Sequence, residues 1–224
     1  MPDKYPKNVK IIEVGPRDGL QNEPSLVSLI DKKNLVKNLI NSGLKDIEVG
    51  SFVSPKWVPQ MAESAELINA ISPTKQYDLN LSALVPNIKG LESAIHTNIN
   101  SIAIFASASE TFSQKNINCS IDESLERFSE VFKKTSASNL PVRGYVSCAF
   151  GCPYEGDIDH QKVIKLTAKL LELGCYEVSI ADTIGCGTPS ETDSLLHGLI
   201  AAVGRETIAM HFHDTHGRAL ENIE

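Results

Sequence analysis

The stretch Val9-Lys10-Ile11-Ile12-Glu13-Val14-Gly15-Pro16-Arg17-Asp18-Gly19 narrows the choice of fold. It predicts a first β-strand over residues 9–14 that runs into a Gly-Pro-Arg-Asp-Gly turn. An open, doubly wound nucleotide-binding sheet is expected to carry a Gly-x-Gly-x-x-Gly loop after its first strand. This turn lacks that loop and instead places an arginine and a carboxylate at the strand end, where a (β/α)8 barrel collects its functional side chains.

The rest of the sequence alternates short β-branched runs with stretches of helical period, which is typical of consecutive βα units around a parallel sheet. The other predicted strands cover residues 46–52, 77–85, 101–107, 142–149, 177–182 and 208–213. The clearest predicted helices cover residues 28–41, 120–135 and 163–173. Ser120 and Glu123 form a capping-box pattern at the start of the second of these helices.

Seven predicted strands without a Gly/Ser-rich or Pro-rich linker favour a single catalytic domain over residues 1–224. We expect an α/β fold of the TIM (β/α)8 class. Such barrels typically have eight strands and about 250 residues. This sequence has 224 residues and ends just after its seventh predicted strand, with a helix beginning near residue 217. The expectation is a barrel without its last βα unit, and a miscounted strand is the alternative.

Composition excludes several classes of protein. The sequence is 42% hydrophobic and 22% charged, as in ordinary globular domains. Its net charge of -7 provides no basic surface for nucleic acid. No apolar run approaches the roughly 20 residues of a membrane span, and residues 1–10 lack a signal-peptide core. We therefore expect a cytoplasmic protein with no nucleic-acid or membrane partner. The five cysteines form no Cys-x-x-Cys pair, which indicates reduced thiols.

The last predicted strand contains a His-x-His pair, His211 and His213. Side chains alternate along a strand, so both imidazoles lie on one face and Phe212 lies on the other. Both histidines could then reach one metal ion. Two histidines that are merely hydrogen-bonded near a strand end are the alternative that this spacing leaves open.

The first turn carries Arg17 and Asp18. In a closed barrel the first and seventh strands are separated only by the eighth, so Asp18 could face His211 and His213. One carboxylate and two imidazoles suit Mg²⁺, Mn²⁺ or Zn²⁺. Arg17 offers a positive fork for a carboxylate or oxyanion, although a surface Arg-Asp turn is the alternative.

Glu48 lies between two apolar residues of the second predicted strand, so its carboxylate points to the face opposite to theirs. A carboxylate inside a barrel needs a cationic or hydrogen-bonding partner, and Arg17 is our candidate. A structural salt bridge and a catalytic role both remain open for it. Other polar candidates at or after strand ends are Gln21, Ser51, Ser147, Ser179 and Asp182.

Two loops are open to more than one interpretation. Residues 185–189 lead into a helix with Thr188 as N-cap and Pro189 as its first residue, so their amides could hold a phosphate or simply form a capped turn. Trp57 lies in a proline-bracketed loop and could line a pocket or cover the barrel.

Residues 14–23, 51–61, 144–156 and 211–215 closely resemble hydroxymethylglutaryl-CoA lyases. That family belongs to a metal-dependent TIM-barrel superfamily that also contains isopropylmalate synthase, homocitrate synthase and hydroxy-oxovalerate aldolase. The Arg-Asp-Gly and His-x-His elements are common to the superfamily. The Leu-Gln-Asn-Glu extension, the Ser-Pro-Lys-Trp-Val-Pro loop and the Gly-Cys-Pro-Tyr-Glu-Gly turn are similar to the lyases specifically.

The resemblance implies cleavage of 3-hydroxy-3-methylglutaryl-CoA, a small acyl-CoA substrate, to acetyl-CoA and acetoacetate, by an enzyme that is a homodimer when full-length. It implies a divalent metal, Mg²⁺ or Mn²⁺, with Asp18, His211 and His213 as ligands. It also implies two sets of site residues. The catalytic residues are Arg17, Asp18, Glu48, Asp182 and His211. The substrate-binding residues are Arg17, Gln21, Ser51, Ser147 and Ser179. Glu48 and Asp182 are assigned to holding Arg17 and to proton transfer.

The family also has an asparagine metal ligand and a glycine-rich loop with a catalytic cysteine, both after the seventh strand. We expect this sequence to end before them, so none of its five cysteines takes that role. Weak metal binding and slow turnover, or none, are therefore expected. The alternatives are a related metal-dependent aldolase or acyl-CoA condensing enzyme, and a non-catalytic barrel that binds metal or acyl-CoA.

Overall fold

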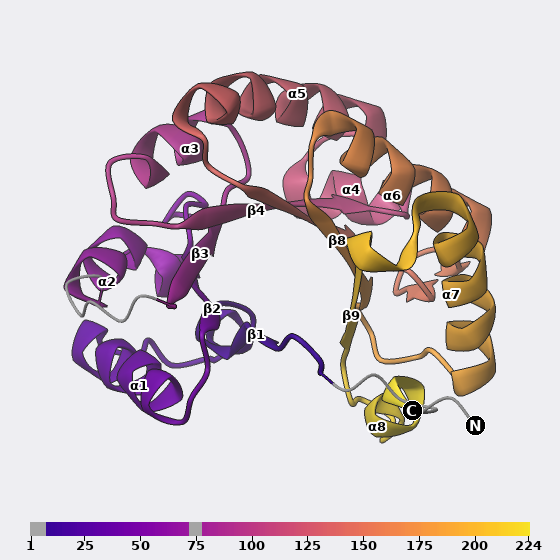
Figure 1. Cartoon of the computed structure of the whole chain (residues 1–224), viewed down its shortest axis with the longest axis horizontal. Helices are drawn as coiled ribbons and strands as arrows, with labels where there is room; N and C mark the ends of the chain where they lie inside the picture. Colours follow the sequence, from indigo (N-terminus) through magenta and orange to yellow (C-terminus); the bar gives the residue numbers. More distant parts are fainter. Residues whose placement is uncertain (1–7, 72–77) are drawn as a thin grey trace. The chain divides into compact units, whose positions relative to one another are not determined.

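The computed structural model describes residues 8–71 and 78–224. The chain forms two compact units. The first unit comprises Met1–Val85 and Lys89–Ser101, and the second comprises Pro86–Ile88 and Ile102–Glu224. Both are built from parallel strands with helices packed on them (Figure 1).

The first unit contains three parallel strands, β1 (Ile12–Glu13), β2 (Asp46–Ser51) and β3 (Asn80–Leu84). β2 pairs with both of the others. Its helices are α1 (Leu29–Asn41), α2 (Ser64–Ile71) and α3 (Ile88–Ala94), with short turns η1 (Gly15–Gly19) and η2 (Pro59–Met61). Ile47 and Val49 of β2 enter the apolar core under α1 and α2. Alternation along the strand therefore turns Glu48 to the opposite face.

The second unit contains β4 (Ser101–Ser107), β5 (Val142–Ser147), β8 (Glu177–Asp182) and β9 (Ile208–Phe212), paired in parallel in that order. Its helices are α4 (Glu110–Ile117), α5 (Ile121–Ser138), α6 (His160–Leu173), α7 (Pro189–Val203) and α8 (Ala219–Ile223), with a short turn η3 (Arg205–Thr207). α5, α6 and α7 follow one another along the outside of the strands (Figure 1). An antiparallel hairpin of β6 (Gly151–Cys152) and β7 (Gly156–Asp157) follows β5.

All seven predicted strands are present, and several are shorter than predicted. In the first, only Ile12 and Glu13 pair with β2. β5 ends at Ser147 because Cys148 adopts a left-handed backbone conformation with φ of 59°. β2 and β9 each end one residue early, so Phe52 and His213 follow their strands. Tyr77, at the start of the third predicted strand, lies outside the described residues.

The predicted helix signals are confirmed. Ser120 and Glu123 form the capping box of α5, and Thr188 caps α7 with Pro189 as its first residue. Three short helices were not predicted from the sequence: α2, α3 and α4, which have 8, 7 and 8 residues. Two helical turns carry too little periodicity to stand out from a loop.

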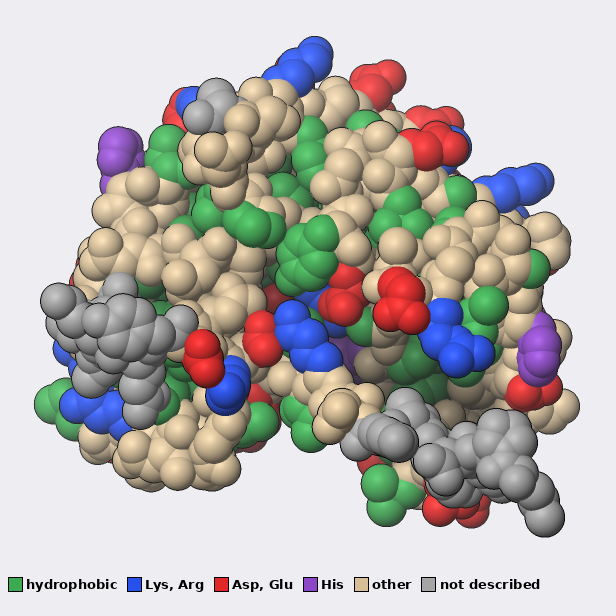
Figure 2. Space-filling view, viewed as in Figure 1, with side chains coloured by type: hydrophobic (Ala, Val, Ile, Leu, Met, Phe, Trp, Pro, Cys, Tyr) green, Lys and Arg blue, Asp and Glu red, His purple; other side chains and the backbone are tan. Residues whose placement is uncertain are grey.

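The described part of the chain contains no helix that is long and apolar enough to cross a membrane. All five cysteines are free, as predicted. On the face drawn in Figure 2, basic side chains of the coloured residues lie singly or beside acidic ones rather than in one continuous area.

Candidate active site

The turn η1 after β1 is a single π-helical turn, a conformation that often occurs at functional sites. Its start is fixed because the Gly15 amide donates to Glu13 Oε1 at 2.6 Å. A Cβ atom at Gly15 would lie 2.7 Å from that oxygen, so a larger residue there would displace the Glu13 carboxylate. The turn buries Arg17 and leaves Asp18 half-buried.

Arg17 is held between two carboxylates of the first unit. Its Nε donates to Glu48 Oε1 at 2.5 Å, and its Nη1 donates to Asp18 Oδ1 at 2.6 Å. Glu48 is only 1% exposed. The predicted ion pair of Arg17 with Glu48 is therefore present, and the guanidinium orientation is fixed by two charge-assisted hydrogen bonds.

The loops that follow β1 and β2 are tied together by Gln60. Its side-chain oxygen accepts from the Val27 amide at 2.9 Å, and its side-chain nitrogen donates to Ser25 O at 3.0 Å. Trp57 on the second of these loops is 84% exposed, so it covers no core. Gln21 on the first loop is also exposed.

Ser51 shapes the loop at the end of β2. Its hydroxyl accepts from the Val53 amide at 3.2 Å, and its own amide donates to Ser64 Oγ at 3.0 Å. Gly50 lies against Ser64 so closely that any Cβ there would overlap the serine hydroxyl. The backbone at this strand end is thus determined by local contacts.

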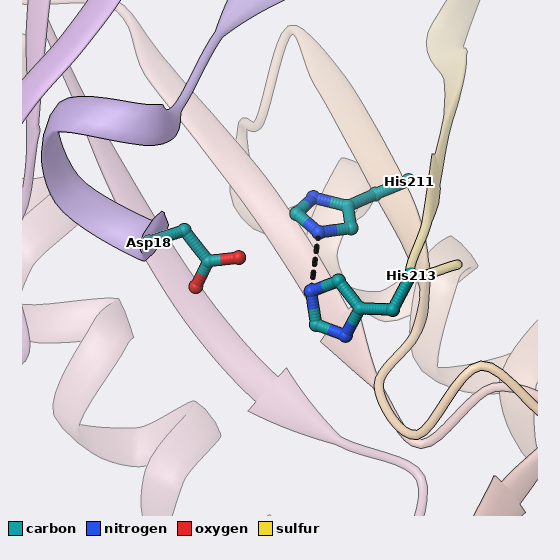
Figure 3. A group of neighbouring side chains, drawn as sticks. All are labelled: Asp18, His211 and His213. Carbon is teal, nitrogen blue, oxygen red and sulfur yellow. Dashed lines mark hydrogen bonds between the residues drawn. The ribbon is translucent and has the colours of Figure 1, made fainter. Parts of the chain in front are cut away.

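In the second unit, His211 and His213 face each other, as their spacing predicts (Figure 3). Their Nε2 atoms are 3.1 Å apart, and their ring centroids are 4.9 Å apart. Phe212 points the other way and packs on Phe150, with 6.2 Å between ring centroids. Figure 3 also shows Asp18 at the η1 turn of the first unit.

A backbone carbonyl fixes one of these imidazoles. His213 Nδ1 lies 2.8 Å from Thr183 O. A carbonyl oxygen can only accept, so Nδ1 carries the hydrogen and Nε2 is the nitrogen that faces His211. Metal-binding histidines commonly have this arrangement, with the second ring nitrogen bonded to a carbonyl or carboxylate.

Asp182 is 1% exposed at the end of β8, and both of its carboxylate oxygens accept backbone hydrogen bonds. Cys186 N donates to Oδ1 at 3.0 Å, and Gly187 N donates to Oδ2 at 2.9 Å. The Thr188 amide donates to Glu191 at 2.9 Å. These amides are therefore engaged within the chain, which supports the capped turn over a phosphate site at residues 185–189.

Ser147 and Ser179 lie on the inner face of β5 and β8. Ser179 is 1% exposed and is the register partner of Tyr145, and Ser147 is half-buried at the end of β5. Tyr145 itself contacts the His211 ring edge-on, with centroids 6.4 Å apart. Alternation of side chains thus brings both serines to the face that bears His211.

Four cysteine thiols of the second unit are not activated. Burial raises the pKa of Cys148 and of Cys175 to about 12. Burial also raises the pKa of Cys119 and of Cys186. A reactive cysteine needs a lowered pKa, so these four thiols are poor nucleophiles at neutral pH.

Sequence reasoning missed Thr183 and Tyr145. The Thr183 hydroxyl accepts from the Cys148 amide at 2.7 Å, and its carbonyl binds His213. Its position directly after Asp182, at a strand end, was the available signal. Tyr145 could have been found from its alternation with Ser147 in the same strand.

Known proteins match nearly the whole chain. The HMGL-like family model matches residues 8–224. The 3-hydroxy-3-isohexenylglutaryl-CoA/hydroxy-methylglutaryl-CoA lyase of Pseudomonas aeruginosa is 52% identical over 97% of this chain and 72% of its own length. Human mitochondrial hydroxymethylglutaryl-CoA lyase is 50% identical over 97% of this chain and 66% of its own length. The chain thus spans about two thirds to three quarters of these relatives.

Solved structures agree. The crystal structure of hydroxymethylglutaryl-CoA lyase from Pseudomonas aeruginosa superimposes with a TM-score of 0.94 at 52% identity, covering 97% of this chain and 72% of that one. A lyase of Acinetobacter baumannii in complex with coenzyme A and 3-methylmalate gives a TM-score of 0.89 at 34% identity, covering 94% and 68%. The predicted TIM-barrel class is confirmed, with seven of the parallel strands within this chain. The chain belongs to the hydroxymethylglutaryl-CoA lyase (HMGL-like) family.

Proposed function

We propose that this chain contributes to the catalytic centre of a lyase that cleaves 3-hydroxy-3-methylglutaryl-CoA into acetyl-CoA and acetoacetate. The names of relatives at 50–52% identity support this substrate. Within the chain, the proposal rests on the two imidazoles whose Nε2 atoms converge to 3.1 Å at the carboxyl end of β9. The complex of the Acinetobacter baumannii lyase with coenzyme A supports an acyl-CoA ligand.

We further propose that Asp18, His211 and His213 bind one Mg²⁺ or Mn²⁺ ion. Their donor set, a carboxylate and two imidazoles, suits either ion, and all three side chains are half-buried. The carbonyl on His213 Nδ1 leaves its Nε2 available as a ligand atom. A bound ion would supply Lewis acidity and orient the substrate oxygens.

The reaction requires loss of a proton from the tertiary hydroxyl of the substrate. The adjacent carbon–carbon bond then breaks to give the acetoacetate carbonyl, and its electron pair forms the enolate of acetyl-CoA, which takes up a proton at carbon. We assign Arg17 to stabilising the charge on the thioester oxygen, since Glu48 and Asp18 hold its guanidinium in place. Loss of one such preorganised donor typically lowers kcat by about 10² to 10³-fold.

The remaining assignments are parts of the same proposal. Glu48, which is hydrogen-bonded to Arg17, and Asp182 are assigned to holding Arg17 and to proton transfer, and His211 takes part as a metal ligand. Gln21, Ser51, Ser147 and Ser179 are proposed substrate contacts. Residues 1–224 are proposed as one catalytic domain, and a homodimer is the proposed assembly of the full-length enzyme.

The test measures release of acetyl-CoA and acetoacetate from 3-hydroxy-3-methylglutaryl-CoA with Mg²⁺ or Mn²⁺ present, and after chelation. We expect activity that requires the ion and that Asp18→Ala lowers by about 10²-fold or more. Asp78→Ala, at an exposed carboxylate paired with Lys45, is the matched control and should leave the rate unchanged. Cleavage of hydroxy-oxovalerate alone would favour the related aldolase, and metal-independent cleavage would contradict the ligand assignment.

A further inference from the structure

Thr183 makes two hydrogen bonds that lead to two different parts of the second unit. Its hydroxyl accepts from the amide of Cys148 at 2.7 Å, at the end of β5. Its carbonyl accepts from His213 Nδ1 at 2.8 Å, beyond the end of β9. A single residue after β8 therefore connects the ends of the strands on both sides of it.

The contact with Cys148 holds an unusual piece of backbone. Cys148 is fully buried and has φ of 59°, a left-handed conformation that non-glycine residues rarely adopt. The next amide, of Ala149, donates to Ala181 O at 3.0 Å. Two hydrogen bonds to the end of β8 thus keep this turn in place, and Thr183 supplies one of them.

The contact with His213 is equally constrained. Gly185, two residues after Thr183, has φ of 67°, and a Cβ atom there would lie 2.7 Å from His213 O. The loop after β8 therefore packs closely on the backbone of His213 as well as on its ring. Movement of Thr183 would move the carbonyl that orients this imidazole.

We propose that Thr183 is a positioning residue for His213: its hydroxyl anchors the β8 end to the Cys148 turn and thereby fixes the carbonyl that sets the ring orientation and tautomer of His213. The inference rests on the proposed metal site and adds to it a residue that touches neither metal nor substrate. Loss of such an outer partner of a metal-binding histidine typically lowers metal affinity about 10 to 100-fold.

The experiment compares three substitutions in the full chain. Thr183→Val removes the hydroxyl and keeps the shape and the carbonyl, and Thr183→Ser restores the hydroxyl. Thr167→Val is the matched control, because it removes a threonine hydroxyl at a buried position, where that hydroxyl donates to Val163 O within α6. The readouts are the Mn²⁺ dissociation constant from electron paramagnetic resonance and the imidazole ¹⁵N spectrum of His213 in metal-free protein.

We expect Thr183→Val to raise the Mn²⁺ dissociation constant about 10-fold and to replace the single His213 tautomer by a mixture. Thr183→Ser and Thr167→Val should match the parent in both readouts. A folded Thr183→Val protein with unchanged Mn²⁺ affinity and an unchanged His213 spectrum would overturn the inference. If Thr183→Val does not fold, the smaller Thr183→Ala decides by the same criteria.

The two proposals fail in different ways. A folded parent that binds no Mn²⁺ overturns the proposed metal site, and the metal-free His213 spectrum of Thr183→Val then still decides whether Thr183 orients the ring. If the parent binds Mn²⁺, and folded Thr183→Val has the same Mn²⁺ dissociation constant and the same His213 ¹⁵N spectrum as the parent, only the role of Thr183 is contradicted.

Discussion

The candidate site residues of the two units have different kinds of hydrogen-bond partners. In the first unit, Arg17 pairs with the carboxylates of Glu48 and Asp18. In the second unit, Asp182 accepts from two backbone amides and His213 bonds to a backbone carbonyl. A buried charge that loses its charged partner stays unsatisfied, whereas a loop that loses one hydrogen bond can relax.

This difference separates two tasks. Side-chain pairs leave a fixed positive group, Arg17, which suits a site that must stabilise negative charge. The backbone contact at Nδ1 of His213 orients its imidazole and leaves Nε2 available, which suits a metal ligand. The predictions below test whether the two regions respond to substitution as differently as their contacts imply.

The largest effect is expected for Glu48→Ala in the first unit. It breaks the buried ion pair and leaves the Arg17 guanidinium with one fewer carboxylate partner, so the free energy of unfolding should fall by about 3 to 5 kcal/mol. Urea denaturation measures the change. Asp78→Ala, at a pair that is 75% exposed at Asp78, should change stability by less than about 1 kcal/mol. Equal losses of unfolding free energy in the two variants would show that breaking the buried ion pair costs no more than breaking the exposed one.

In the second unit, Asp182→Asn should have a smaller effect. The new NH₂ group cannot accept a hydrogen bond, so one of the amides of Cys186 and Gly187 loses its acceptor. The expected loss is about 1.5 to 3 kcal/mol in the same urea assay. Asp193→Asn, at a carboxylate that is 74% exposed, should be close to neutral. A loss for Asp182→Asn larger than that for Glu48→Ala would reverse the comparison of the two units.

Cys175 adds a pH-dependent test of a thiol whose pKa is raised by burial alone, from 9.0 to about 12. Its stabilising contribution is complete below pH 9, where both states are protonated, and is lost as pH rises from 9 to 12. The free energy of unfolding should fall by up to about 1.4 kcal/mol per pH unit in that range. Cys175→Ala should remove this part of the slope between pH 8 and 10, and an identical slope would contradict the assignment.

The smallest effect is expected for Ser120→Ala at the start of α5. It removes the side-chain acceptor for the Glu123 amide, which should cost about 1 kcal/mol. Ser129→Ala, within the same helix, removes only a bond to the Glu126 carbonyl and should change stability by a few tenths of a kcal/mol. A loss equal to that of Asp182→Asn would mean that helix caps matter as much as strand-end contacts.

Sequence reasoning predicted the features that local patterns determine. β-branched runs located all seven strands, and strand alternation correctly paired the faces of His211 and His213. Glu48, an acidic residue between two apolar ones, correctly indicated a buried partner for Arg17. Each of these predictions needed only the neighbouring residues in the sequence and the rule that the carboxyl ends of parallel strands lie at the same edge of a sheet.

Several of the missed features depend on loop backbone. The π-helical shape of η1 and the left-handed Cys148 arise from contacts that no periodicity encodes. The amide bonds of Asp182 and the two bonds of Thr183 require the folded course of the loop after β8. A residue type alone does not reveal whether its partner is a side chain or a peptide group.

The central claim is that His211 and His213 bind one divalent ion through their Nε2 atoms. Pulsed electron paramagnetic resonance of bound Mn²⁺ tests it most directly, because it detects directly coordinated imidazole nitrogens. The account predicts modulation from two such nitrogens in the parent protein, and from one nitrogen in each of His211→Ala and His213→Ala. Bound Mn²⁺ with no imidazole modulation, or modulation unchanged in both variants, would contradict it.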